Sequence, residues 1–159
     1  MIKDTIRANM ISAMRAKDKK AKDTYAYMLD QIQKAEKSRV TIDNPNPVLS
    51  EAEIMGVIQE LVKQSRDAIV KTRKAAEGKK TDITGFISDK EAEISIYMQF
   101  LPEEMTADEI MVVIRETADA ITGNINKGVL MKNILPKVKG KADNRLVVEL
   151  VDKFLTDVK

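Results

Sequence analysis

Apolar residues recur every three or four positions in nearly every stretch of this 159-residue chain that lies between helix-breaking residues. This is the spacing of one face of an α-helix, and it does not fit the strict alternation of a half-buried strand. The chain has three Tyr, three Phe and no Trp, so its core must consist of Ile, Leu, Val, Met and Ala side chains. The sequence therefore predicts an all-α, multihelical protein.

Breakers and capping residues divide this pattern into seven expected helices. Ser50 and Thr106 are each followed by Glu three residues later, which is the pattern of a capping box. Asp18 and Asp143 are expected as N-caps of two further helices. The expected helices are a first segment with the stripe Ile2, Ile6, Met10 and Met14, one from Asp18 to near Ser38, a long one from Ser50 to the break at Gly78, one over 89–99, one from Thr106 to Gly123, one over 127–135 closed by Pro136, and a last one that starts at Asp143.

Two features outside the helices carry expectations of their own. The run Asn44-Pro45-Asn46-Pro47 cannot continue a helix, and residues 40–42 before it are expected as a short extended piece. Met residues fall mostly on the apolar stripes, and four of them are expected in the core: Met10, Met14, Met28 and Met98.

Pro102 divides the chain into two expected helical subdomains. Residues 1–101 form an N-terminal helical subdomain that contains the long helix, and residues 102–159 form a C-terminal three-helix bundle. A bundle of fewer than about 70 residues is marginally stable alone. We therefore expect the two halves to pack on one another or to flex about residues 102–105.

The chain has no Cys and no His, and this limits its chemistry. Disulfides, thiolate nucleophiles, cysteine zinc sites, imidazole bases and serine triads are all excluded. The glycine-rich loops that bind nucleotide phosphates are absent too. The acidic residues near Pro102 lack the further ligands of a metal site; they are Glu91, Glu93, Glu103 and Glu104. We expect no cofactor, no metal and no catalytic residue.

A basic loop before the last expected helix is the first candidate binding site. It places three lysines beside the exposed amides of a helix start, where the macrodipole also favours an anion. Phosphate is the natural ligand, and Gly140 allows its close approach to the backbone. The alternative is a solvated connection in which the lysines serve solubility. The candidate residues are Lys137, Lys139, Gly140, Lys141 and Arg145.

A second basic corner lies at the junction of the first two expected helices. Its charges suit contacts with nucleic-acid phosphates. No aromatic residue lies between them, so recognition of the backbone is favoured over base stacking. A solvated turn is again the alternative. The candidate residues are Arg15, Lys17, Lys19, Lys20 and Lys22.

The expected compartment is the cytoplasm. No stretch reaches the ~20 apolar residues that a membrane span needs, so we expect no membrane partner. The first ten residues lack the apolar run of a secretory signal. The formal net charge of +2 excludes a polycation that coats nucleic acid indiscriminately.

Four segments of the chain resemble the YqeY family, whose members are stand-alone relatives of the tail domain of the GatB subunit of tRNA-dependent amidotransferases. They are MRAKDK (14–19), KQSRDAI (63–69), KEAEISIYMQFLPEEMTADEI (90–110) and LPKVKGKADNRLV (135–147). The resemblance covers essentially residues 1–157 and implies a helical fold of two subdomains.

The resemblance also implies a function. The related tail domain contacts tRNA, while glutamine hydrolysis and aminoacyl activation take place on other domains and subunits. The preferred hypothesis is an accessory protein that binds tRNA or another RNA through its phosphates and is not catalytic alone. The alternatives are a subunit or stimulator of an amidotransferase, which is a carbon–nitrogen ligase with glutamine as amido donor, and a helical protein–protein adaptor.

Two positions of the last matching segment depart from the family pattern. Lys141 takes the place of an Arg, which keeps the charge and loses the forked contact with phosphate. Asn144 takes the place of a Gly, and Asn is the non-glycine residue best suited to a left-handed backbone. We therefore expect Asn144 to keep the geometry of the glycine.

Overall fold

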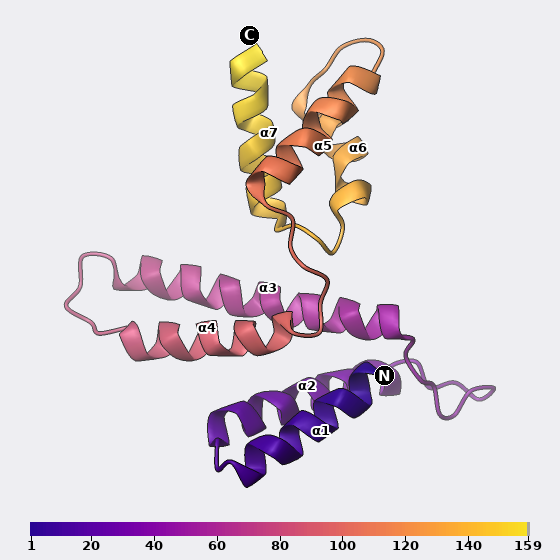
Figure 1. Cartoon of the computed structure of the whole chain (residues 1–159), viewed down its shortest axis with the longest axis vertical. Helices are drawn as coiled ribbons and strands as arrows, with labels where there is room; N and C mark the ends of the chain where they lie inside the picture. The colour runs from indigo at the N-terminus through magenta and orange to yellow at the C-terminus, as the bar shows by residue number, and fades with distance from the viewer. Residues whose placement is uncertain (159) are drawn as a thin grey trace. The chain divides into compact units, whose positions relative to one another are not determined.

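The computed structural model describes residues 1–158 and places them in seven α-helices, with no strand in that range (Figure 1). Residue 159, the last of the predicted C-terminal subdomain, lies outside the described residues. The helices are α1 (Ile2–Arg15), α2 (Lys19–Lys37), α3 (Glu51–Ala76), α4 (Thr84–Met98), α5 (Ala107–Ala120), α6 (Lys127–Val138) and α7 (Asn144–Val158). The predicted all-α fold is confirmed. Within residues 1–158, none of the helices combines the length and the apolar character that a membrane span requires.

The helices form two groups, each with its own apolar core. The first unit is Met1–Leu101 and contains α1 to α4. The second unit begins at Pro102 and contains α5 to α7. The predicted organisation into an N-terminal and a C-terminal helical group is therefore confirmed.

In the first unit, α1 packs against α2 and α3 packs against α4, as two helical hairpins (Figure 1). Buried side chains recur three or four positions apart because only one face of each helix meets its neighbours. Tyr25 and Phe100 meet edge to face, with ring centroids 6.4 Å apart. The buried core consists of Ile6, Ala13, Tyr25, Met28, Ile32, Leu49, Ile54, Ile58, Leu61, Val62 and Tyr97.

The second unit is a three-helix bundle in which each helix contacts the other two. Its fully buried core is aliphatic, so it is stabilised by close packing and by removal of apolar surface from water. The partly buried ring of Phe154 packs against this core. The core consists of Ile110, Ile114, Ala118, Leu130, Ile134, Val138, Val147, Leu150 and Val151.

Side-chain caps determine where several helices begin. The Asp18 carboxylate accepts a hydrogen bond from the Ala21 N–H at 3.0 Å, as predicted. Ser50 and Thr106 each begin a complete capping box with the Glu three residues later, and both predictions are confirmed. Asn126, which the sequence analysis did not single out, caps α6 by accepting a hydrogen bond from the amide three residues later.

Helix α4 begins at Thr84 and not at residue 89. The Asp82 carboxylate accepts a hydrogen bond from the Thr84 N–H at 3.0 Å, and this bond lowers the pKa of Asp82. The negative charge also interacts favourably with the helix start. The helical signal in the sequence is weak here because Gly85, in the first turn, is a poor helix former.

Helix α6 continues through Pro136 to Val138, so the prediction that Pro136 ends it is wrong. A proline in the last turn removes one helical hydrogen bond, the one that its own N–H would donate to the carbonyl of Lys132. Val138 is fully buried in the core of the second unit. Its burial offsets the lost bond and holds the last turn in place.

Met14 is 55% exposed, so its predicted place in the core is wrong. Residues four apart on a helix are rotated by about 40°, so an apolar stripe with this spacing turns steadily away from the core. By the end of α1 the buried position is Ala13. The other predictions are confirmed, because Met28 is buried and Met10 and Met98 pack against the same core.

Residues 40–42 form a loop, and the prediction of an extended piece there is wrong. The Thr41 N–H donates to the Asn44 carbonyl at 3.0 Å, and the Asn44 N–H donates to the Thr41 hydroxyl at 3.0 Å. These two hydrogen bonds join Thr41 and Asn44 in a turn. In the described range no strand is present with which an extended segment could pair.

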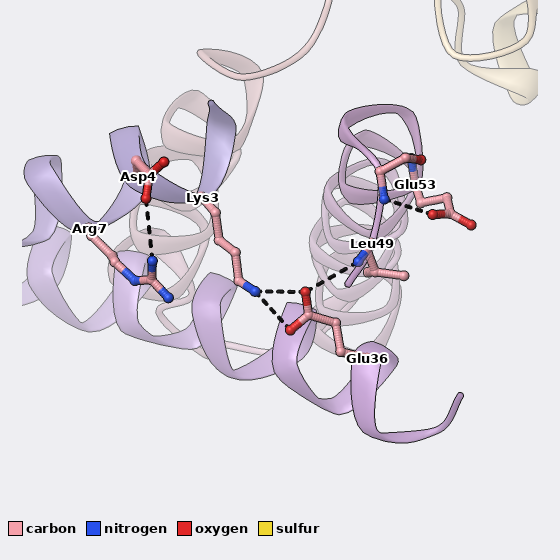
Figure 2. Close-up of polar contacts among 7 residues, drawn as sticks. Lys3, Asp4, Arg7, Glu36, Leu49 and Glu53 are labelled. Atoms are coloured by element: carbon pink, nitrogen blue, oxygen red, sulfur yellow. Dashed lines mark hydrogen bonds and ion pairs between the residues drawn. The ribbon is translucent and has the colours of Figure 1, made fainter. Parts of the chain in front are cut away.

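The carboxylate of Glu36 links three segments of the first unit (Figure 2). Lys3 Nζ donates to its two oxygens at 2.6 and 2.8 Å, and the Leu49 N–H donates to it at 3.3 Å. Burial alone raises the pKa of Glu36, but the hydrogen bonds and the charge of Lys3 outweigh it, and the pKa is lowered. The ionised carboxylate therefore joins α1, α2 and the segment before α3.

A second carboxylate stabilises the start of α3. Glu53 accepts a hydrogen bond from the Ser50 N–H at 2.8 Å, and the Arg39 guanidinium pairs with the same side chain. The hydrogen bond from Arg39, followed by those from Ser50, lowers the pKa of Glu53 to about 2. This pair attaches the loop after α2 to the beginning of α3.

Glu36→Gln should make the stability of the first unit less dependent on pH. Because the pKa of Glu36 is lower in the folded chain, its contribution is complete above the unfolded pKa of about 4.3 and is lost as the pH falls through the folded pKa. The variant should lower the free energy of unfolding by about 1–3 kcal/mol at pH 7, and by less at pH 3. Urea denaturation at the two pH values measures this difference.

Glu91→Gln is the matched control for this measurement, because Glu91 is an exposed glutamate of α4. It should leave the stability nearly unchanged at both pH values. A loss for Glu36→Gln that is the same at pH 7 and pH 3 would contradict the role given to its charge.

Candidate nucleic-acid interface

A type II turn joins α6 to α7. Lys139 has φ −55° and ψ 124°, and Gly140 has φ 77°, which are the angles of the two central residues of such a turn. The Lys141 N–H closes it by donating to the Val138 carbonyl at 2.9 Å. The positive φ favours glycine, so Gly140 fixes the turn between two exposed lysines. Asn144, expected in a left-handed conformation, is instead the first residue of α7, and that prediction is wrong.

The turn is held on the side of α5 by a backbone contact. The Met105 N–H donates to the Lys141 carbonyl at 2.7 Å, and Val138 at the start of the turn is fully buried. The backbone under the two lysines is therefore fixed on both sides. A ligand that binds there has to order the lysine side chains but not the loop, which lowers the entropic cost.

Lys137 lies against α5. Its Nζ donates to the Thr117 hydroxyl at 2.9 Å, and this hydroxyl donates to the Val113 carbonyl at 2.7 Å. The contact orients the ammonium group and leaves its charge in place, because the hydroxyl is neutral. The sequence could not indicate Thr117, which is on a different helix and 20 residues away. We call Lys137, Lys139 and Lys141 the lysine turn.

One backbone amide at the start of α7 is already hydrogen-bonded within the protein. The Asp143 carboxylate accepts a hydrogen bond from the Arg145 N–H at 2.9 Å, so the predicted cap is confirmed. This capping engages one of the amides that would otherwise face an anion.

The guanidinium-bearing residue Arg145 is exposed. Among the ion pairs of residues 1–158, none includes a member of the lysine turn.

The second predicted corner is the junction of α1 and α2 in the first unit. The Lys17 N–H donates to the Met14 carbonyl at 3.1 Å, and the Asp18 N–H donates to the Ala13 carbonyl at 2.9 Å. These are the two hydrogen bonds of a Schellman motif, whose left-handed residue is usually glycine. Here that residue is Lys17, with φ 57°. The motif turns the chain sharply into the Asp18 cap of α2.

Two of the basic residues at this corner have acidic partners. Lys20 Nζ lies 2.6 Å from Asp89 of α4, and the hydrogen bond between them raises the pKa of Lys20. Lys22 Nζ lies 3.6 Å from Asp23. The sequence could not predict the Asp89 contact, because it depends on how α2 and α4 pack. The exposed residues of this corner without an ion pair in the described part of the chain are Arg15, Lys17 and Lys19.

Lys17→Gly should be more stable than Lys17→Ala by about 1 kcal/mol, because a left-handed residue with a Cβ is strained and glycine is not. The same pair of substitutions at Lys22, within α2, should give the opposite order by about 1 kcal/mol. Thermal unfolding of the four variants measures both differences. If alanine is the more stable residue at both positions, the backbone conformation assigned to Lys17 is wrong.

Two helical units, joined at Pro102 and carrying basic helix connections at the surface, define a small all-helical protein. A family model described as Yqey-like protein matches residues 3–155. The chain therefore belongs to the YqeY-like family, and the resemblance found in the sequence is confirmed. A search of curated proteins finds no match.

Proposed function

We propose that this YqeY-like protein is an accessory protein that binds tRNA, or another structured RNA, through the phosphate backbone and has no catalytic activity alone. The observation that supports this most is the lysine turn. Lys139 and Lys141 are exposed on either side of Gly140, and neither has an ion pair among the described residues. A polyanion gains most from such cations, because no ion pair within the protein has to be broken first.

The chemistry of the lysine turn favours backbone contacts over reading of bases. An ammonium group is a compact point charge that contacts any phosphate, whereas specific recognition needs aromatic stacking or forked hydrogen bonds to base edges. No aromatic residue lies between residues 101 and 153. Arg145, exposed on the first turn of α7, can add one forked contact with a phosphate.

The resemblance to the GatB tail domain supports tRNA as the RNA and tRNA-dependent amidation as the setting, which is a cytoplasmic process in this proposal. The protein then binds the tRNA while other subunits carry out the glutamine-dependent chemistry. The absence of Cys and His supports this division of labour. Glutamine turnover by the purified protein alone would refute it.

Replacing Lys139 and Lys141 together by Ala should weaken tRNA binding. In fluorescence anisotropy between 50 and 200 mM salt, the affinity of the unmodified protein should fall steeply as the salt concentration rises. The slope of log affinity against log salt should be smaller in the variant by about 1.5, since each lost phosphate contact removes about 0.7–0.9.

The matched control replaces Lys132 and Lys153, two exposed lysines of α6 and α7, by Ala. It removes the same charge from the same unit and should keep most of the affinity and the slope. The proposal fails if the unmodified protein does not bind tRNA at low salt, or if the control loses as much affinity as the lysine-turn variant.

A further inference from the structure

A cavity of about 620 Å³ lies between α2, α3 and α4 in the first unit. This volume is in the range of small-molecule sites, about 300–1,000 Å³. Part of its lining is apolar, from Ala21, Leu61 and Ile96, and Tyr27 also lines it. The lysine turn, in the second unit, has no part in this cavity. The cavity therefore offers a binding site separate from the proposed RNA contact.

The hydroxyl of Tyr97 has no partner within the described chain. Tyr97 is 2% exposed and lines the cavity, and its hydroxyl makes none of the hydrogen bonds of residues 1–158. Over the same residues, no polar side-chain atom that is sealed from solvent lacks a partner, so this hydroxyl is accessible from the cavity. Burial, and then the charges of Glu93 and Tyr27, raise the pKa of Tyr97. The phenol therefore stays neutral, and its oxygen can accept a hydrogen bond from a ligand.

The charged lining selects for a cation. Each ammonium group of the lining already has a carboxylate partner: Lys20 lies 2.6 Å from Asp89, and Lys90 lies 3.1 Å from Glu93. Within the lining, carboxylates outnumber ammonium groups by four to two, which favours a cation over an anion inside the cavity. The exposed cations of the neighbouring corner, Arg15, Lys17 and Lys19, are outside the lining. The charged lining residues are Asp18, Asp23, Asp89 and Glu93 on the acidic side and Lys20 and Lys90 on the basic side, and Lys22, outside the lining, lies 3.6 Å from Asp23.

The polar groups of the cavity extend along α2 and α4. Near one end Lys20 meets Asp89, and near the other Tyr27 and Glu93 lie close enough to Tyr97 to influence its pKa. The stretch of α2 from Lys20 to Tyr27 is about 10 Å long. A ligand that reaches the polar groups at both ends is therefore elongated.

We propose that this cavity binds a linear organic cation of the polyamine class, with amine groups separated by methylene chains. One amine donates to the Tyr97 hydroxyl oxygen and to the Glu93 carboxylate. Another amine lies against the carboxylates of Asp18 and Asp23. The methylene groups pack on Leu61 and its apolar neighbours. The carboxylates offset the cost of removing the ammonium groups from water.

Isothermal titration of the full chain with spermidine, at about 150 mM salt and without RNA, tests this site directly. Spermidine should bind saturably at one site, and n-butylamine, with a single amine, should bind at least about tenfold more weakly. Glutamate should not bind. The proposal is overturned if no saturable binding occurs up to millimolar spermidine, or if Mg²⁺ at equal concentration displaces it, since the cation would then be an unspecific counterion.

Tyr97→Phe separates a ligand contact from a structural role, because it removes only a hydroxyl without a partner in the described chain. It should keep the melting temperature and weaken spermidine binding by about fivefold or more. Tyr25→Phe is the matched control, since the Tyr25 hydroxyl donates to Gln99 at 3.4 Å and lies outside the lining. Asp23→Asn should weaken binding as well. Unchanged affinity in Tyr97→Phe, or equal losses in both tyrosine variants, would overturn the assignment.

Discussion

The structure depends on the pairing of amphipathic helices, because no helix of this chain can remove its apolar face from water alone. Burial of one Leu, Ile or Val side chain contributes about 1.5–3 kcal/mol, and each helix gains it only against a neighbour. In the first unit the neighbours are the two hairpins α1–α2 and α3–α4, and in the second they are α5, α6 and α7. Most of each apolar helix face is thereby used in packing. Helix ends and connections, and the cavity between α2, α3 and α4, remain as the places where polar groups can meet a ligand.

Charged side chains at these ends fall into two groups. Some form ion pairs within the protein, as do Lys3 with Glu36 and Lys20 with Asp89. Others stay exposed without an ion pair in the described range, as do Lys139 and Lys141 beside Gly140. No member of the lysine turn has an ion pair in the described range, whereas two of the five basic residues at the α1–α2 corner, Lys20 and Lys22, are paired with carboxylates, and this difference favours the α6–α7 turn as a phosphate contact. The two corners have similar sequences and different surroundings.

Local features of the fold could be predicted because they depend on residues close together in the sequence. The capping boxes at Ser50 and Thr106 each need only two residues three apart, and the apolar faces follow from helical spacing. The end of α6 could not be predicted, because the burial of Val138 in a core built from three helices outweighs the effect of Pro136.

The same distinction between local and tertiary features decides which parts of the candidate sites could be predicted. The position of lysines on either side of a glycine was visible in the sequence, and so was their place before a helix. The contact of Lys137 with Thr117 and the open hydroxyl of Tyr97 were not, since both depend on packing between helices. The cavity between α2, α3 and α4 likewise leaves no local pattern, because its lining comes from three helices that only tertiary packing brings together.

The central claim is that the α6–α7 turn is the phosphate contact of this protein. The most direct measurement is a titration of the isotope-labelled full chain with tRNA at low salt, followed through its backbone amide resonances. The account predicts that the largest shifts fall on residues 137–147 and that they revert when salt is added. Shifts confined to other parts of the chain, with residues 137–147 unaffected at saturating tRNA, would contradict it.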